Sequence, residues 1–163
     1  MDEFMPELGR YILRALDTFD DDHKAMNRAL RVGTDLRSTL SRVAATEFRY
    51  LQRSRRWLLE LELVVRYCDD EAFAQSAREG YRDLDDIDGM IYAKALRRHG
   101  YRFARPWTNE TAYRSIQALL EGAMLRTLVD PDAGFGSTRS DEGSYARTVV
   151  AFVSNIIEPL DES

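Results

Sequence analysis

The stretch LLEGAMLRTLVDPD, residues 119–132, has apolar side chains on nearly every face of a predicted helix and a glycine, Gly122, near its middle. Glycine inside a helix costs about 1 kcal/mol relative to alanine, so a close contact with a neighbouring helix is a reasonable compensation. At helical spacing the residues form two faces. The bulky face holds Ala112, Tyr113, Ile116, Leu119, Leu120, Ala123 and Met124, and the small face holds Ser115, Ala118, Gly122, Leu125 and Val129. We expect the bulky face to pack on the protein's own core.

The last predicted helix, residues 141–158, is also too apolar for an ordinary surface helix. Two such helices at the end of a chain predict a homodimer in which two copies of each form a four-helix bundle. The predicted interface comprises Ser115, Ala118, Gly122, Leu125, Val129, Val149, Phe152, Val153 and Ile156. The alternative is that both helices are buried inside a monomer.

Turn-forming residues are scarce in the first two thirds of the chain, which predicts an all-α fold. No proline occurs between Pro6 and Pro106, and residues 34–79 contain neither glycine nor proline. We expect a single helical domain over 1–163 and no convincing strand. Helices are predicted at 2–18, 22–33, 36–54, 56–68, 70–99, 109–129 and 141–158.

Composition excludes several classes of function. The net charge is −5, which argues against a protein that coats nucleic acid or an anionic membrane with its whole surface. With one cysteine, Cys68, and two histidines, His23 and His99, neither an internal disulfide nor a Cys/His metal cluster is expected. No signal peptide or membrane span is predicted, and we expect a cytoplasmic protein without cofactor or metal. Arginine greatly outnumbers lysine, as is common in high-GC bacterial genomes.

Three segments in a fixed order carry a resemblance to a known family. LLELELVVRYCDDEAFAQSAREGYRDLDDIDGMIYAKALRRHG is followed by TNETAYRSIQALLEGAMLRTLVDPD and then by an apolar closing helix. This order, over about 57–158, resembles the C-terminal half of TetR-family transcription regulators. The resemblance implies a multi-helix bundle whose last two helices dimerise, with a pocket for a small and mainly apolar effector in each subunit. We expect the helices at 56–68, 70–99 and 109–129 to bound a closed apolar cavity.

The family's DNA-reading part has no counterpart in this sequence. Such regulators begin with a helix-turn-helix whose glycine-containing turn sets a recognition helix into the major groove. Residues 34–79 lack glycine, and too few residues precede Leu36 for such a unit. We therefore expect DNA contact only through a helix-turn-helix that is not in this chain. That unit is on another polypeptide, has been lost, or precedes Met1 in a longer protein.

Aromatic residues near helix ends are the predicted pocket residues, with one carboxylate. The set is Trp57, Tyr67, Asp88, Tyr92, Tyr101, Phe103 and Trp107. Plain core packing is the alternative for each aromatic residue. Asp88 lies within an apolar stripe of its helix, whereas Asp83, Asp85 and Asp86 point elsewhere. A carboxylate on the inward face needs a partner. That partner is either a ligand's amine or hydroxyl group or an arginine of this chain such as Arg55, Arg56 or Arg114.

Two further patterns have an ordinary explanation. Residues 24–56 carry nine Lys/Arg against Asp35 and Glu47, a balance of +7 that suits either an edge facing phosphates or a solvated helix face. The acidic string at Asp83, Asp85 and Asp86 resembles a terpene-cyclase motif but is expected by chance in acidic helices. No phosphate loop, nucleophile elbow or metal spacing is present. We thus expect no enzyme, and two hypotheses stay open beside a remote enzymatic one: the regulator domain, and a helical interaction protein that dimerises with an intact regulator.

Overall fold

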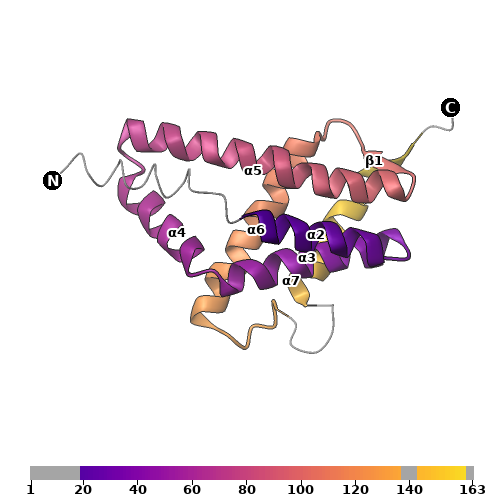
Figure 1. Cartoon of the computed structure of the whole chain (residues 1–163), viewed down its shortest axis with the longest axis horizontal. Helices are drawn as coiled ribbons and strands as arrows, with labels where there is room; N and C mark the ends of the chain where they lie inside the picture. The colour runs from indigo at the N-terminus through magenta and orange to yellow at the C-terminus, as the bar shows by residue number, and fades with distance from the viewer. Residues whose placement is uncertain (1–18, 137–142, 161–163) are drawn as a thin grey trace.

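The computed structural model describes residues 19–136 and 143–160, which fold mainly into helices (Figure 1). The helices are α2 (Phe19–Val32), α3 (Leu36–Arg53), α4 (Arg55–Tyr67), α5 (Glu71–Arg98), α6 (Asn109–Val129) and α7 (Ser144–Ser154). Two short strands, β1 (Tyr101–Phe103) and β2 (Ile157–Pro159), pair in antiparallel orientation. The predicted helical fold class is confirmed. The helix predicted over 2–18 lies outside the described residues.

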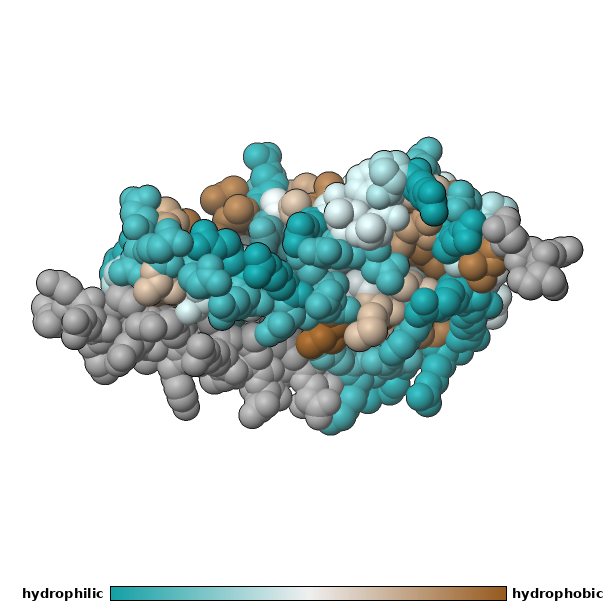
Figure 2. Space-filling view, turned by 90° about the horizontal axis from the view of Figure 1, so that it is seen from above, coloured by the Kyte–Doolittle hydropathy of each residue, from teal (hydrophilic) through white to brown (hydrophobic). Residues whose placement is uncertain are grey.

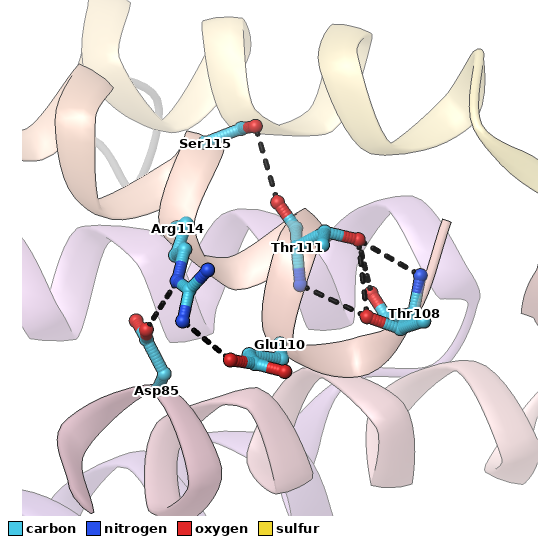
Figure 3. A network of polar contacts seen from close by, with 6 residues as sticks. All are labelled: Asp85, Thr108, Glu110, Thr111, Arg114 and Ser115. Atoms are coloured by element: carbon cyan, nitrogen blue, oxygen red, sulfur yellow. Dashed lines mark hydrogen bonds and ion pairs between the residues drawn. The ribbon is translucent and has the colours of Figure 1, made fainter. Parts of the chain in front are cut away.

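Local sequence explains where two of the helices begin. Thr108 caps α6: its Oγ1 accepts a hydrogen bond from the Thr111 amide at 3.1 Å, and Thr111 Oγ1 accepts one from the Thr108 amide at 2.9 Å (Figure 3). Asp35 and Ser38 form the same reciprocal arrangement at the start of α3. These pairs satisfy amide groups that the first turn of a helix leaves without partners. The predicted bounds of α6, 109–129, agree with the structure.

The end of the chain differs from its prediction. The helix expected over 141–158 is α7, which ends at Ser154, and the chain then forms β2 against β1. In this pairing Arg102 Nε donates to Glu158 Oε1 at 2.8 Å, and Phe103 lies opposite Ile157. The expectation of no strand was therefore wrong. A three-residue strand is too short to produce a recognisable alternation of apolar and polar residues.

The core consists of two clusters of buried side chains. The larger cluster joins α2, α3, α5, α6 and α7, and its fully buried members include Leu40, Tyr92, Ile116 and Val149. The smaller cluster lies between α4 and α5, where Leu63 packs with Phe73 and Ala77. As expected, the bulky face of α6 points into the larger cluster, with Leu119 only partly buried.

A glycine allows α5 and α6 to approach closely. A Cβ atom on Gly89 would lie 3.2 Å from the carbonyl oxygen of Asn109 and 3.4 Å from the Cβ of Tyr113. Beside this approach, Arg114 Nε donates to Asp85 Oδ2 at 2.7 Å, and the same guanidinium pairs with Glu110 (Figure 3). The beginning of α6 is thus fixed against α5, which determines where Tyr113 lies.

Hydrophobic side chains reach the surface at several places. Figure 2 shows one face on which hydrophobic groups interrupt a mainly hydrophilic surface. On α6, Leu125 is 44% exposed, Leu128 50% and Val129 79%. Within the described ranges, no helix combines the length and hydrophobicity needed to cross a bilayer.

Candidate functional site

A cavity of about 60 Å³ lies between α3, α4, α5 and α6. This volume is the space open to the centre of a water-sized sphere, so the cavity has room for several water molecules or a small organic molecule. It is lined by Glu47, Leu51, Trp57, Glu60, Leu61, Val64, Ala77, Gly80, Tyr81, Leu84, Asp88, Tyr113, Gln117 and Glu121. Three of these helices are ones from which a pocket was predicted, and α3 is the fourth wall.

Apolar side chains make up much of the wall. Leu51 comes from α3, Trp57, Leu61 and Val64 come from α4, and Leu84 comes from α5. Trp57 is buried within the larger cluster, whereas Val64 packs against the smaller one. The cavity therefore lies where the two clusters meet, and α4 closes one side of it.

Carboxylate groups form an unexpectedly large part of the polar wall. Each of the four helices contributes one: Glu47 from α3, Glu60 from α4, Asp88 from α5 and Glu121 from α6. Among the described residues that line the cavity there is no lysine, arginine or histidine. The cavity thus combines an apolar surface with carboxylate groups from all four helices, of which only Asp88 belongs to the predicted pocket set.

Three tyrosines surround the buried carboxylate of Glu47. Tyr92 Oη donates to Glu47 Oε2 at 2.8 Å, Tyr113 Oη donates to Glu47 Oε1 at 2.9 Å, and Tyr145 Oη lies 3.2 Å from Oε2. Glu47 is 2% exposed, and burying a carboxylate is costly unless donors replace the lost water. The tyrosines come from α5, α6 and α7, so this contact ties three helices to α3.

The same environment changes the acidity of the three hydroxyl groups. Burial raises the pKa of Tyr92, Tyr113 and Tyr145 well above the ordinary value, and the negative charge of Glu47 raises it further. Ionisation would place a second negative charge beside a buried carboxylate. The hydroxyl groups therefore remain protonated donors throughout the physiological range.

Asp88 has internal partners, but neither is the predicted arginine. Its Oδ1 lies 2.7 Å from His23 Nε2, and its Oδ2 lies 3.0 Å from Tyr113 Oη. Arg114 pairs instead with Asp85, which is 5% exposed although the helical pattern placed it away from the apolar stripe. Asp88 is also 5% exposed, as its position in the stripe predicted.

Tyr113 brings more acceptors together than its single proton can serve. Besides Glu47 Oε1 and Asp88 Oδ2, its hydroxyl lies 3.0 Å from Gln117 Oε1. A hydroxyl group has only one hydrogen to donate. Three acceptor oxygens therefore share the one hydroxyl hydrogen at this end of the cavity.

Glu121 and Tyr81 lie on the part of the cavity wall formed by α5 and α6. Glu121 Oε1 accepts a hydrogen bond from Gln117 Nε2 at 3.3 Å. Burial raises the pKa of the Glu121 carboxyl group above 4.5, and Asp85 adds to this effect. Burial, together with the charges of Glu121 and Glu60, raises the pKa of Tyr81 to about 12. A negative potential therefore acts on both side chains.

Of the predicted pocket residues, the structure brings Trp57 and Asp88 to the cavity. Tyr92 lies behind the wall and reaches it through Glu47. The other four do not line the cavity. Tyr67 lies against the ring of Phe73 in a tilted arrangement, and the ring of Trp107 meets that of Phe152 edge to face, with 5.5 Å between their centroids. Phe103 is buried beside β2, and Tyr101 packs on the core from β1. Core packing is the role that the structure shows for them.

The sequence prediction missed Glu47, Glu60 and Glu121. Glu47 had a usable signal, because it lies between Val43 and Leu51 on the apolar stripe of its helix, as Asp88 does on its own. Glu60 and Glu121 are only partly buried and lie at the edges of their stripes. Nothing in the spacing of one helix reveals that side chains from two helices share a cavity.

The predicted dimer residues fall into two groups. On α6, Ala118, Gly122, Leu125 and Val129 are exposed and Ser115 is partly so, and a Cβ on Gly122 would meet no atom within 4 Å. The small face of α6 is therefore not covered by the described part of the chain. On α7 and after it, Val149, Val153 and Ile156 are buried in the chain's own core, and Phe152 is partly buried. The expectation that these three offer an open face needs correction.

Among the described side chains, no three from His, Cys, Asp and Glu are grouped so that they could hold one metal ion. Comparison of the chain with protein-family models, with curated proteins and with solved structures gave no match.

Proposed function

We propose that this chain is a ligand-binding regulatory domain that holds a small effector in the cavity between α3, α4, α5 and α6 and forms a homodimer through α6. The cavity is the observation that carries the proposal. It has aliphatic and aromatic walls and a few polar groups, which is the usual make-up of a small-molecule site. Under this proposal the domain acts in the bacterial cytoplasm.

The geometry of α6 supports a link between ligand and dimer. Tyr113, Gln117 and Glu121 line the cavity, whereas Ala118 and Gly122 lie on the exposed face of the same helix. A ligand that shifts α6 would therefore also shift a dimer contact made by its other face. In the proposed likeness to TetR-family regulators, such a shift would move a helix-turn-helix that lies outside this chain.

Binding in the cavity can be measured through Trp57. The chain has two tryptophans, and Trp107 packs on Phe152 away from the cavity, so Trp107→Phe leaves a single reporter in the wall. We expect cyclohexylmethanol, which does not absorb at the excitation wavelength, to change the Trp57 emission saturably. Gly80→Leu should abolish this change, because Gly80 lines the cavity and a Cβ there meets no atom within 4 Å.

Glu79→Leu is the matched control, since Glu79 is the exposed neighbour of Gly80 on α5. It should leave the titration unchanged. An emission change that persists in Gly80→Leu would place the ligand elsewhere and would contradict the proposed site.

The exposed face of α6 also favours a second function, that of an interaction protein which dimerises with an intact regulator. Light scattering on the purified chain separates the two. A stable homodimer supports the first proposal, whereas a monomer that dimerises only when a longer regulator is co-expressed supports the second. Enzymatic activity is not proposed.

A further inference from the structure

We infer that the cavity is selective for an organic cation, a protonated amine with a compact apolar body, and that Glu121 is the carboxylate that pairs with the ammonium group. This inference rests on the proposed function, because it names the class of ligand for the same cavity.

The charge of the wall is the first argument. Four carboxylates, one from each surrounding helix, line a cavity to which the described lining residues contribute no cationic side chain. Opposite charges attract each other more strongly in a protein cavity than in bulk water, because the effective dielectric constant is lower. A monocation beside Glu121 is therefore attracted, while an anion there is repelled.

Glu121 is the carboxylate best placed to form the ion pair. It is half-buried, and the hydrogen bond that the structure shows for it comes from the neutral amide of Gln117. Asp85, which also acts on it, is already paired with Arg114. Asp88 and Glu47, by contrast, lie among tyrosine hydroxyl groups and, for Asp88, His23.

The surroundings of Glu121 suit an ammonium group that carries hydrocarbon. Tyr81 and Tyr113 line the same cavity, and a cation that lies over an aromatic ring is attracted to it. Trp57, Leu61 and Leu84 supply the apolar wall for the rest of the ligand. No three of the described His, Cys, Asp and Glu side chains are grouped so that they could hold a metal ion.

The acceptor oxygens around Tyr113 support the same chemistry. Three oxygens, from Glu47, Asp88 and Gln117, lie within 3.0 Å of one hydroxyl group. A protonated primary amine brings three N–H donors and no acceptor. Its donors therefore match a part of the wall that is rich in acceptor oxygens.

The experiment is isothermal titration calorimetry at pH 7.5 with three probes of one skeleton: cyclohexylmethylamine, cyclohexylmethanol and cyclohexanecarboxylate. We expect the amine to bind at least about tenfold more tightly than the alcohol, and the carboxylate to bind more weakly than either, because only the ammonium is attracted by the wall. Glu121→Gln, which keeps the shape of the side chain, should lower the affinity for the amine about tenfold and change that for the alcohol by less than about twofold.

Glu62→Gln is the matched control, because Glu62 is an exposed carboxylate on α4 that does not line the cavity. It should leave all three affinities unchanged. Equal binding of amine and alcohol would overturn the inferred selectivity while leaving the ligand-binding function intact, and no binding of any probe would contradict both. Undiminished amine binding by a folded Glu121→Gln protein would overturn the role of Glu121.

Discussion

At the residue scale, Glu47 shows how a charged side chain becomes part of a core. Its carboxylate accepts hydrogen bonds from the hydroxyl groups of Tyr92, Tyr113 and Tyr145, which belong to three different helices. Removing one partner of a buried polar contact costs more than the contact itself contributes, because the other partner is left without water. The four side chains therefore act together in fixing how α5, α6 and α7 meet α3.

The three tyrosines predict a loss of stability at alkaline pH. In the unfolded chain a tyrosine ionises near pH 10, whereas burial and Glu47 raise the pKa of these three well above 10 in the folded protein. Their contribution to the free energy of unfolding is therefore fully present below about pH 10 and is lost as the pH rises further. The free energy of unfolding should fall by up to about 1.4 kcal/mol per pH unit for each tyrosine. Urea denaturation between pH 9 and pH 11 measures this slope.

Two variants check the assignment. Tyr145→Phe should reduce the alkaline slope by one tyrosine's share. Phe48→Leu changes a non-ionisable ring that lies 5.3 Å from Tyr145, so it should lower stability by about 1 kcal/mol at every pH and leave the slope unchanged. A slope that is the same in Tyr145→Phe as in the original protein would refute the account.

Single-residue predictions succeeded where one helix held all the information. The apolar stripe of α5 predicted that Asp88 is buried, and the structure shows it 5% exposed. Its partner was misjudged, because the choice between His23 and an arginine depends on which helix lies opposite. Asp85 was misplaced for a similar reason: Arg114 of α6 covers it from another part of the chain.

At the element scale, α6 has two faces with different neighbours. Ile116 and Leu120 on the bulky face are fully buried in the core, whereas on the small face a Cβ at Gly122 would meet no other atom of the described chain within 4 Å. No packing contact among the described residues therefore requires a glycine at this position. A second subunit placed on this face would supply one, as the proposed dimer requires.

Gly122→Trp tests that contact. Because a side chain at this position points into open space within one chain, the variant should remain folded. If the face is a close dimer contact, the bulky ring should weaken self-association by at least about 2 kcal/mol, by analogy with overpacking of a core. Sedimentation velocity over a range of concentrations measures the change.

Gln75→Trp on the exposed side of α5 is the control and should sediment like the original protein. An unchanged sedimentation profile for Gly122→Trp would remove α6 from the dimer interface. If the original protein sediments as a monomer, the proposed dimer is contradicted.

The shortest elements were the hardest to predict. Residues 157 and 158 were predicted to end an apolar helix, but 157–159 pair with Tyr101–Phe103, which lie far away in the sequence. Such a pairing depends on two distant segments meeting, and three residues carry too little pattern to show it. Helix starts were easier, because Thr108 and Thr111 cap α6 with contacts made entirely within four residues.

At the scale of the whole molecule, the cavity arises because α4 stands between two cores. Trp57 joins the larger cluster, while Leu63 and Val64 join the smaller cluster with α5. The helical class and the four helices around the cavity could be predicted from periodicity, whereas the choice of three of them as pocket walls came from the family resemblance. The acidic lining could not, since it exists only when Glu47, Glu60, Asp88 and Glu121 meet from four helices.

The most direct test of the account locates the ligand. Isotope-filtered NOE spectra of the labelled protein with unlabelled cyclohexylmethylamine report which side chains touch the ring. We predict contacts from the cyclohexyl protons to the Trp57 indole and to the methyl groups of Leu61 and Leu84, which form the apolar wall. Contacts to Trp107 and Phe152, or to Leu128 and Val129, without any to Trp57, would contradict the claim that this cavity is the effector site.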